Sequence, residues 1–348
     1  MGMLWFWIVA VMLTAYVVLD GFDIGVGVVY LLVAREQRER RQALASIGPV
    51  WDGNEVWLLA AGGTLFFAFP MLYASSFSGF YLPLMMVLWL LMLRGISLEL
   101  RHHSTEPVWR SLLDGVFVLA NVLLAIFYGA ALANVVRGVP IGADGYFFLP
   151  LWTDWRTGTS PGILDWYTVL GGVLALVALA CHGACWLAMK TTGKVELRAQ
   201  GLARKLVPLV GVLTLVSIPA TVMARPASLT NYQQYPVLYL APAGVATGLL
   251  IAWLGLRKGA TGQGFAGMVV YLTAMMVGAA VGMYPVLLPN VAPGGHDLTV
   301  QTALAGEHTL HVGLVWWIFG MLLAAGYIVT AYWLFRGKVD EDAEGYGH

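Results

Sequence analysis

Two neighbouring stretches decide the fold: residues 19–27 read L-D-G-F-D-I-G-V-G, and residues 46–59 read S-I-G-P-V-W-D-G-N-E-V-W-L-L. Both lie in segments apolar enough to cross a membrane, yet together they carry four carboxylates, Asp20, Asp23, Asp52 and Glu55. A charge near the bilayer centre is costly, so acids inside a membrane are candidates for function. We expect the rest of the chain to keep these acids away from lipid.

The composition indicates an all-α, polytopic membrane protein. Of the 348 residues, 59% are hydrophobic and only 11% are charged, whereas about a quarter of a soluble domain is charged. The apolar runs reach the ~20 residues that cross a bilayer as a helix, and barrel strands would be about 10 residues long with alternating polarity. The net charge is zero, so no nucleic-acid partner is indicated.

Neither the amino terminus nor the cysteines suggest processing or a metal site. No Lys or Arg precedes the first apolar run, and a cleavable signal peptide has a basic start, so we expect the first helix to be retained. Cys181 and Cys185 lie inside one apolar run and form neither a disulfide framework nor a CxxC motif.

The hydrophobic pattern predicts one membrane domain, residues 1–348, with nine transmembrane helices. Their expected ranges are 4–33, 49–70, 77–99, 112–136, 165–189, 206–224, 237–256, 266–288 and 309–335.

The connections between these spans alternate in charge. The odd-numbered connections, the C-terminal tail and Arg94 hold 16 of the 19 basic residues. Because Lys and Arg mark the cytoplasmic side, we expect an outside N-terminus and a cytoplasmic C-terminus. We expect the tail, residues 340–348, to be disordered.

Asp20 and Asp23 are three residues apart and therefore share one face of the first helix. Gly21, Gly25 and Gly27 lie on or near that face, and small residues let another helix approach closely. The acids should thus point into a helix interface. They could serve chemistry, or they could only join helices by hydrogen bonds.

The second and third spans carry acids near the cytoplasmic side. Asp52 is about 5 Å into its helix, and Glu55 is one turn deeper; either could simply stabilise the helix N-terminus. Glu99 ends the third span, and Arg94, five residues deeper, either snorkels or pairs with an acid.

Together these residues suggest a ladder from Asp52 and Glu99 at the inner surface to Asp23 and Asp20 near the midplane. Acid chains of this kind carry protons in pumps and transporters. The gap between the two levels is roughly 13 Å at the helical rise, so waters or hydroxyls must fill it.

The histidines give weaker signals. His182 lies inside the fifth span; it could ligate a haem, but a lone His without a second ligand favours a hydrogen bond to a backbone carbonyl. His308 and His311 share a helix face, but no third ligand is evident. We therefore predict no metal site.

Five segments resemble subunit II of the cytochrome bd quinol oxidases. They are D-G-F-D-I-G-V-G at 20–27, P-V-W-D-G-N-E-V-W-L at 49–58, A-G-G-T-L-F-F-A-F-P-M-L-Y at 61–73, F-S-G-F-Y at 77–81 and R-G-I-S-L-E-L-R at 94–101. G-V-P at 138–140, H-G-A at 182–184 and M-Y-P-V-L-L-P at 283–289 add weaker support.

The resemblance implies two four-helix bundles plus one peripheral helix. It also implies an obligate partner, subunit I, which binds the haems b and d and oxidises quinol to reduce dioxygen to water without pumping protons. A small single-span accessory subunit and a structural quinone could accompany them. The location would be a bacterial or archaeal cytoplasmic membrane.

The resemblance also assigns residues. Asp23, Asp52 and Glu99 would belong to a cytoplasmic proton route, which Asp20 and Glu55 could extend. Trp57 would line an oxygen route, and Trp51 would lie near the structural quinone. Some family members carry Asp where this chain has Glu99.

Two other functions remain open from the residues themselves. A proton-coupled secondary transporter would need broken helices around a midplane site in corresponding halves of the chain, and no matching half is visible. A haem-carrying electron-transfer subunit would use His182. Co-purification of a second, haem-bearing membrane subunit would favour the oxidase over both alternatives.

Overall fold

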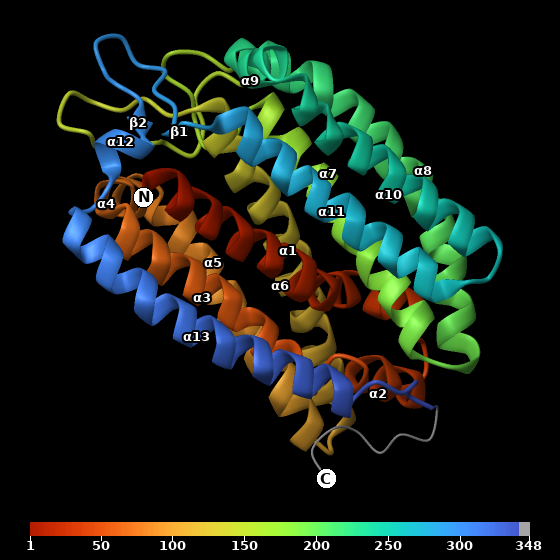
Figure 1. The fold of residues 1–348 in the computed structure, drawn as a ribbon. Coiled ribbons are helices and arrows are strands. Elements are labelled where there is room, and N and C mark those ends of the chain that lie inside the picture. Colours follow the sequence, from red (N-terminus) through yellow and green to blue (C-terminus); the bar gives the residue numbers. More distant parts are fainter. Residues whose placement is uncertain (341–348) are drawn as a thin grey trace.

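The computed structural model describes residues 1–340 and is mainly helical (Figure 1); the tail expected to be disordered lies, except for Asp340, outside them. The helices are α1 (Gly2–Val33), α2 (Gln37–Ala45), α3 (Trp51–Ala68), α4 (Pro70–Gly79), α5 (Tyr81–His103), α6 (Pro107–Arg137), α7 (Trp166–Lys190), α8 (Gly193–Ala224), α9 (Thr230–Gln234), α10 (Leu240–Arg257), α11 (Thr261–Met283), α12 (Val300–Ala303) and α13 (Glu307–Leu334). The short elements are the 3-10 helices η1 (Pro226–Leu229) and η2 (Pro236–Tyr239) and the strands β1 (Val286–Leu288) and β2 (Leu298–Thr299).

Eight helices within the described residues are long and apolar enough to cross a membrane: α1, α5, α6, α7, α8, α10 together with η2, α11 and α13. The one predicted span that is missing from these eight is 49–70, which corresponds to α3. The first two turns of α3 carry Asp52, Asn54 and Glu55. These polar residues lower the hydropathy of an 18-residue helix. The structure therefore establishes a polytopic membrane protein and leaves the count of nine as a prediction.

Several helix ends differ from the predicted ranges, for local reasons. The segment predicted as one helix over 49–70 is interrupted at Phe69, because Pro70 starts a new helix at its first position and lacks the N–H that would continue the old one. The helix predicted over 206–224 already begins at Gly193, since the more polar residues 193–205 extend it beyond the apolar run. The helix predicted to reach residue 288 ends at Met283, before Pro285.

The long helices form two groups that share one interface. Helices α1, α3, α5 and α6 pack with one another, and α7, α8, α10 and α11 form the second group. Helix α1 touches both groups through α3, α6, α7 and α11, and α13 lies along the outside beside α3 (Figure 1). The N-terminus lies at the end that carries β1, β2 and α12, and α2 lies at the other end (Figure 1).

The glycines of α1 explain how it comes close to its neighbours. A Cβ on Gly25 would overlap the carbonyl oxygen of Leu179 in α7, and a Cβ on Gly183 would overlap the backbone of Gly25. A Cβ on Gly27 would meet the side chain of Asn121 in α6. Gly21 and Gly25 therefore face α7, whereas Gly27, about 200° around the helix from Gly25, lies on the side of Asp20 and Asp23 and faces α6.

Candidate functional site

The central contact of the site is an ion pair between α1 and α5. Arg94 Nη1 and Nη2 donate to the two carboxylate oxygens of Asp20 at 2.8 and 2.5 Å, and both side chains are at most 1% exposed. Glu55 of α3 lies 3.7 Å from Arg94 Nη1. Arg94 therefore does not snorkel to the surface; it faces two acids inside the helix bundle.

Asp23 belongs to a second, adjoining contact. Asn54 Nδ2 of α3 donates to Asp23 Oδ2 at 2.7 Å and to the carbonyl oxygen of Leu19 at 3.3 Å. The hydroxyl of Tyr332, from α13, donates to Asn54 Oδ1 at 2.9 Å. Asp23 is fully buried, and its Oδ1 has no hydrogen-bond partner in residues 1–340. A buried carboxyl that keeps one oxygen open can still accept a bond from water.

The structure does not bring all five predicted acids together. Asp20, Asp23 and Glu55 are joined through Arg94 and Asn54, whereas Asp52 and Glu99 are exposed on α3 and α5. The site thus has a buried part that the chain completes by itself. Its outer part lies on surfaces that residues 1–340 leave uncovered.

The two tryptophans differ in their surroundings. Trp51 is half-buried at the start of α3, with its ring centroid 6.0 Å from the guanidinium carbon of Arg94, the outer limit for a cation–π contact. Trp57 is half-buried and packs against the apolar core near the N-terminus.

The surroundings of His182 do not fit a haem. Its Nε2 lies 2.9 Å from the carbonyl oxygen of Val18 in α1, and its ring stacks on Phe265 with centroids 4.9 Å apart. The residue is fully buried, so a haem could reach the unpartnered Nδ1 only by displacing the side chains packed around it. No group of three or more metal-ligating side chains occurs in the described residues, and His311 Nδ1 lies 2.9 Å from the carbonyl oxygen of Glu307.

Three polar contacts of the structure were not predicted from the sequence. Asp114 of α6 accepts from Tyr30 at 2.8 Å, from Arg40 at 2.9 Å and from Arg101. The rule that singles out acids in apolar runs would have found Asp114, which lies in the predicted span 112–136. Tyr16 donates to Tyr128 at 2.8 Å, one turn from Asp20. No feature of the sequence predicted the contact of Asn54 with Tyr332, because only the fold brings these two residues together.

Glu39, in the first turn of α2, has a shifted pKa. Burial raises the pKa of its carboxyl, but backbone N–H groups of Glu36 and Arg35, at 3.0 and 2.7 Å, and Arg198, at 2.7 Å, outweigh burial. The pKa of Glu39 therefore lies below its usual value. Its contact with Arg198 joins α2 to α8.

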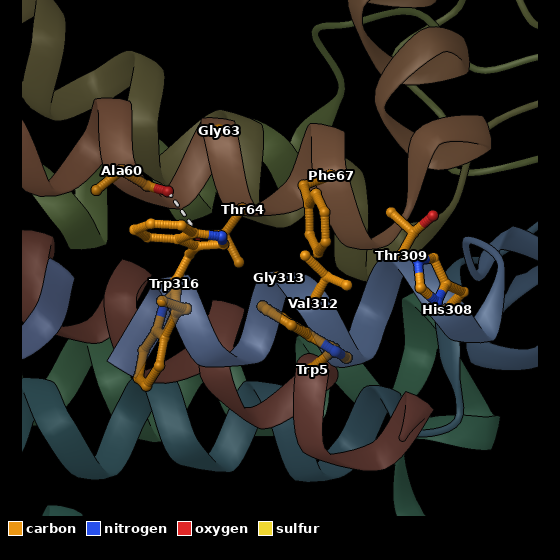
Figure 2. Close-up of a pocket in the computed structure, with 11 residues that line it drawn as sticks. Trp5, Ala60, Gly63, Thr64, Phe67, His308, Thr309, Val312, Gly313 and Trp316 are labelled. Atoms are coloured by element: carbon orange, nitrogen blue, oxygen red, sulfur yellow. Dashed lines mark hydrogen bonds between the residues drawn. The ribbon is translucent and has the colours of Figure 1, made fainter. Parts of the chain in front are cut away.

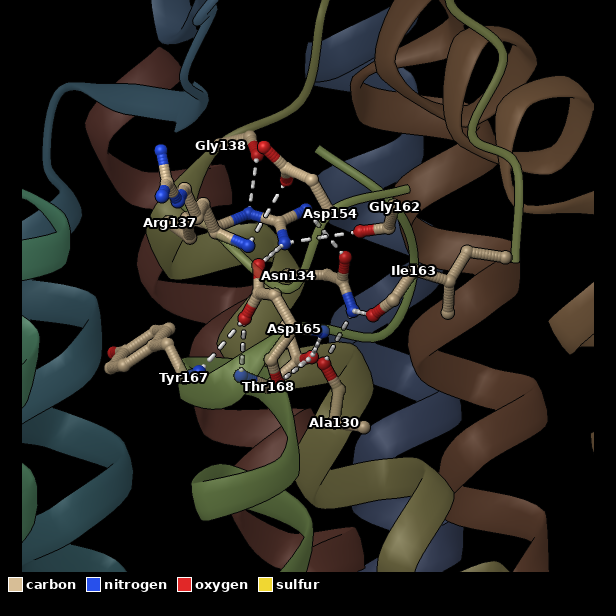
Figure 3. Close-up of polar contacts among 11 residues, drawn as sticks. Ala130, Asn134, Arg137, Gly138, Asp154, Gly162, Ile163, Asp165, Tyr167 and Thr168 are labelled. Atoms are coloured by element: carbon tan, nitrogen blue, oxygen red, sulfur yellow. Dashed lines mark hydrogen bonds and ion pairs between the residues drawn. The ribbon is translucent and has the colours of Figure 1, made fainter. Parts of the chain in front are cut away.

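At the opposite end, a satisfied polar cluster fixes the loop between α6 and α7 (Figure 3). Arg137 donates to Asp165, to Asn134 Oδ1 at 2.7 Å and to the carbonyl oxygen of Gly162 at 3.1 Å. Asp165 also caps α7 by accepting from the N–H groups of Tyr167 and Thr168, each at 2.9 Å. Because the polar side chains of this cluster are paired with one another or with the backbone, we assign it a structural role in holding the loop.

An apolar groove of about 550 Å³ lies between α3 and α13 (Figure 2). Trp5, Phe67, Val312 and Trp316 supply much of its wall, and Thr64, His308 and Thr309 add polar side chains. The hydroxyl of Thr64 is bonded to the Ala60 carbonyl at 2.8 Å. The groove therefore offers apolar surface and little polar recognition.

Comparison with known proteins gives consistent results. The family described as "Cytochrome bd terminal oxidase subunit II" matches residues 1–335. "Cytochrome bd-I ubiquinol oxidase subunit 2" of Escherichia coli strain K12 is 32% identical over 375 residues, covering 99% of this chain and 97% of the relative. "Cytochrome bd ubiquinol oxidase subunit 2" of Bacillus subtilis strain 168 is 31% identical over 337 residues, covering 97% and 96%.

A solved structure has the same fold. "The structure of bd oxidase from Geobacillus thermodenitrificans" contains a chain that superposes with a TM-score of 0.77 at 17% identity, covering 96% of this chain and 98% of that one.

Proposed function

The chain belongs to the cytochrome bd terminal oxidase subunit II family, and from this premise we propose that it supplies part of the cytoplasmic proton route of a quinol:oxygen oxidoreductase. It is a multi-pass membrane protein of a bacterial respiratory oxidase, and its relatives are subunits of terminal oxidoreductases. In the proposed complex it packs against subunit I and stabilises it. We assign the haems b and d, with quinol oxidation and oxygen reduction, to that partner.

The observation that carries the proposal is the group of three acids around Arg94 and Asn54, of which Asp20 and Asp23 are fully buried and Glu55 is half-buried. Intramembrane acids are costly and are retained mainly where protons or ions pass. Asp20 is bonded to Arg94 through both oxygens, which suits a fixed charge. Asp23 is bonded through one oxygen only, so it is the acid best placed to take up and release a proton.

Asp52 and Glu99 would form the cytoplasmic mouth of the route. Both are exposed when the chain is alone, and the positive-inside rule places their helix ends on the cytoplasmic side. In the complex, subunit I would cover these faces and turn the exposed acids into a lined path. Asp52 lies two residues, about 3 Å of helical rise, from Asn54, which bonds to Asp23, so the gap that water would bridge is shorter than the roughly 13 Å expected from the sequence.

Further assignments follow the family. Trp57 would line an oxygen route, Trp51 would lie near a structural quinone, and a small single-span subunit could join the complex. Lipid-facing helices gain little from hydrophobic association, so close packing should dominate the contact with subunit I. Many large apolar side chains of α5 and α13 are exposed in the isolated chain, so these faces would meet lipid or subunit I in the membrane.

The test replaces the proton-carrying carboxyls in the intact complex. Asp23→Asn and Asp52→Asn keep the shape but cannot titrate, so we expect oxygen consumption per haem to fall by at least about tenfold, a smaller loss than the ~10²–10⁴-fold that a positioned general acid or base contributes. Glu99→Gln should have a milder effect, since other surface groups can serve the mouth. Rapid-mixing measurements should show slowed proton uptake.

The matched control is Asp144→Asn, in an exposed turn of the opposite end, which should leave turnover unchanged. Full haem content with wild-type turnover in both Asp23→Asn and Asp52→Asn would place the proton route in the partner subunit and remove the proposal.

A further inference from the structure

We propose that Tyr332, on the peripheral helix α13, is a positioning residue for the Asp23 carboxyl and acts through the side chain of Asn54. The inference rests on the proposed proton route and adds to it a residue from the far end of the chain. Tyr332, Asn54 and Asp23 come from α13, α3 and α1 and form one chain of hydrogen bonds, at 2.9 and 2.7 Å.

The chemistry of the amide gives Tyr332 its role. An Asn side chain accepts through its oxygen and donates through its nitrogen. Because the Tyr332 hydroxyl donates to Asn54 Oδ1, the Nδ2 of Asn54 is directed at Asp23 Oδ2. Without the hydroxyl, rotation of the amide could place Oδ1 against the carboxylate, where two acceptors would oppose each other. The carbonyl oxygen of Leu19 also accepts from Nδ2, at 3.3 Å, so Tyr332 and Leu19 together hold the amide in the orientation that meets the acid.

The position of Tyr332 is itself fixed by the segment 335–340, which we call the C-terminal strap. Lys190 Nζ, at the end of α7, donates to the carbonyl oxygens of Phe335 and Gly337 at 2.6 and 2.7 Å. The N–H of Val339 donates to the Lys190 carbonyl at 2.7 Å, and Gln42 donates to the Val339 carbonyl at 2.8 Å.

The strap matters because α13 has few other anchors. Leu310 is its only buried residue within the described chain, so the helix is not held by a packed core of its own. The strap begins three residues after Tyr332 and joins α13 to α2 and α7. It therefore fixes the position of α13 along its axis, and with it the position of the Tyr332 hydroxyl relative to Asn54.

The ring of Tyr332 has packing contacts that do not need the hydroxyl. It is half-buried against an apolar cluster and lies edge-on to Trp186, with centroids 6.5 Å apart. Phe at this position keeps the ring and removes only the hydrogen bond. The charged groups that act on Asp23 are Asp20, Arg94 and Glu55, and Tyr332→Phe changes none of them.

The experiment compares Tyr332→Phe with Tyr271→Phe in the intact complex, measuring oxygen consumption per haem across a range of pH. Tyr271 is a matched control, because its buried hydroxyl also makes one side-chain hydrogen bond, 2.7 Å to Thr214, in the other helix group. We expect Tyr332→Phe to assemble with full haem, to lose about fivefold in turnover, the order of one neutral hydrogen bond, and to show a displaced pH profile. Tyr271→Phe should keep the wild-type profile.

Coupling to Asp23 is tested in the same assay. In an Asp23→Asn background, adding Tyr332→Phe should cause no further change, because the group that it positions is gone. If Tyr332→Phe fails to assemble, Asn54→Leu breaks the same chain at its centre and should displace the pH profile. A wild-type profile for that variant would overturn the proposal.

The outcomes separate this inference from the proposed function. Wild-type turnover in both Asp23→Asn and Asp52→Asn would reject the proton route itself. A slow Asp23→Asn with a wild-type Tyr332→Phe would reject only the role of Tyr332. Equal losses in Tyr332→Phe and Tyr271→Phe, with the pH profile unchanged, would show a purely structural role and also reject it.

Discussion

At the residue scale, the most consequential interaction is the buried pair of Arg94 and Asp20. Both groups lose their hydration, and attraction in the interior offsets that loss only when the geometry is good. Here the bond is bidentate, at 2.8 and 2.5 Å, and Glu55 adds a second acid at 3.7 Å. Such a pair adds little net stability, but removing one partner leaves a buried charge uncompensated.

Arg94→Gln should therefore destabilise the complex by about 3–5 kcal/mol, the usual cost of breaking a buried pair. The double variant Arg94→Gln with Asp20→Asn should recover part of that loss, because no lone charge remains between them. The temperature at which the complex loses its haem during thermal unfolding measures the stability of both variants. Arg156→Gln, in the exposed outer loop, should be neutral, and an equally neutral Arg94→Gln would contradict the ion-pair account.

At the scale of elements, the contact of α1 with α7 places the acids. Gly25 and Gly183 let the two backbones touch, and His182 of α7 bonds to Val18 of α1 one turn before Phe22. The opposite side of α1 then faces α3 and α5, which supply Asn54 and Arg94. Close approach of α7 at Gly25 and Gly183 is thus a condition for the polar contacts of Asp20 and Asp23 on the other side of α1.

Gly25→Ala should weaken this contact, because its Cβ would overlap the Leu179 carbonyl oxygen and overpacking costs about 1–3 kcal/mol. We expect a several-fold lower yield of haem-containing complex. The control is Gly201→Ala in α8, where a Cβ meets no atom within 4 Å and helix propensity favours Ala by about 1 kcal/mol. Equal yields from the two variants would show that α1 and α7 can separate at little cost.

At the scale of the whole molecule, the distribution of charge predicts orientation. Sixteen of the 19 basic residues, Arg94 included, lie in or near the odd-numbered connections and the C-terminal tail. The strap and α2 lie together at one end of the molecule through the bond from Gln42 to Val339. The positive-inside rule makes this end cytoplasmic, which is the side from which the proposed route takes protons.

Reporter fusions check this orientation. A fusion after residue 340 should score as cytoplasmic, and one in the loop between α6 and α7, near Asp144, should score as external. The reversed pattern would also reverse the direction of the proton route, because Asp52 and Glu99 would then face outward.

Much of the architecture could be predicted from the sequence, because the bilayer constrains it strongly. Backbone groups in lipid must bond within their own segment, so long apolar runs could only be helices, and most predicted ranges overlap a helix of the structure. The spacing of Asp20 and Asp23 predicted a shared face, and the glycines predicted a close approach. The motifs of the first hundred residues also indicated the family.

Only the tertiary structure decided which residues meet these acids. Periodicity shows which side of a helix a residue occupies, but it does not show which helix lies opposite. Arg94 is 74 residues from Asp20, and Tyr332 is 278 residues from Asn54. These contacts depend on how α1, α3, α5 and α13 pack, and packing is set by side-chain shape across helices, which no pattern along one helix contains. For the same reason, the sequence placed Asp52 and Asp23 on one ladder, whereas the fold buries Asp23 and leaves Asp52 exposed.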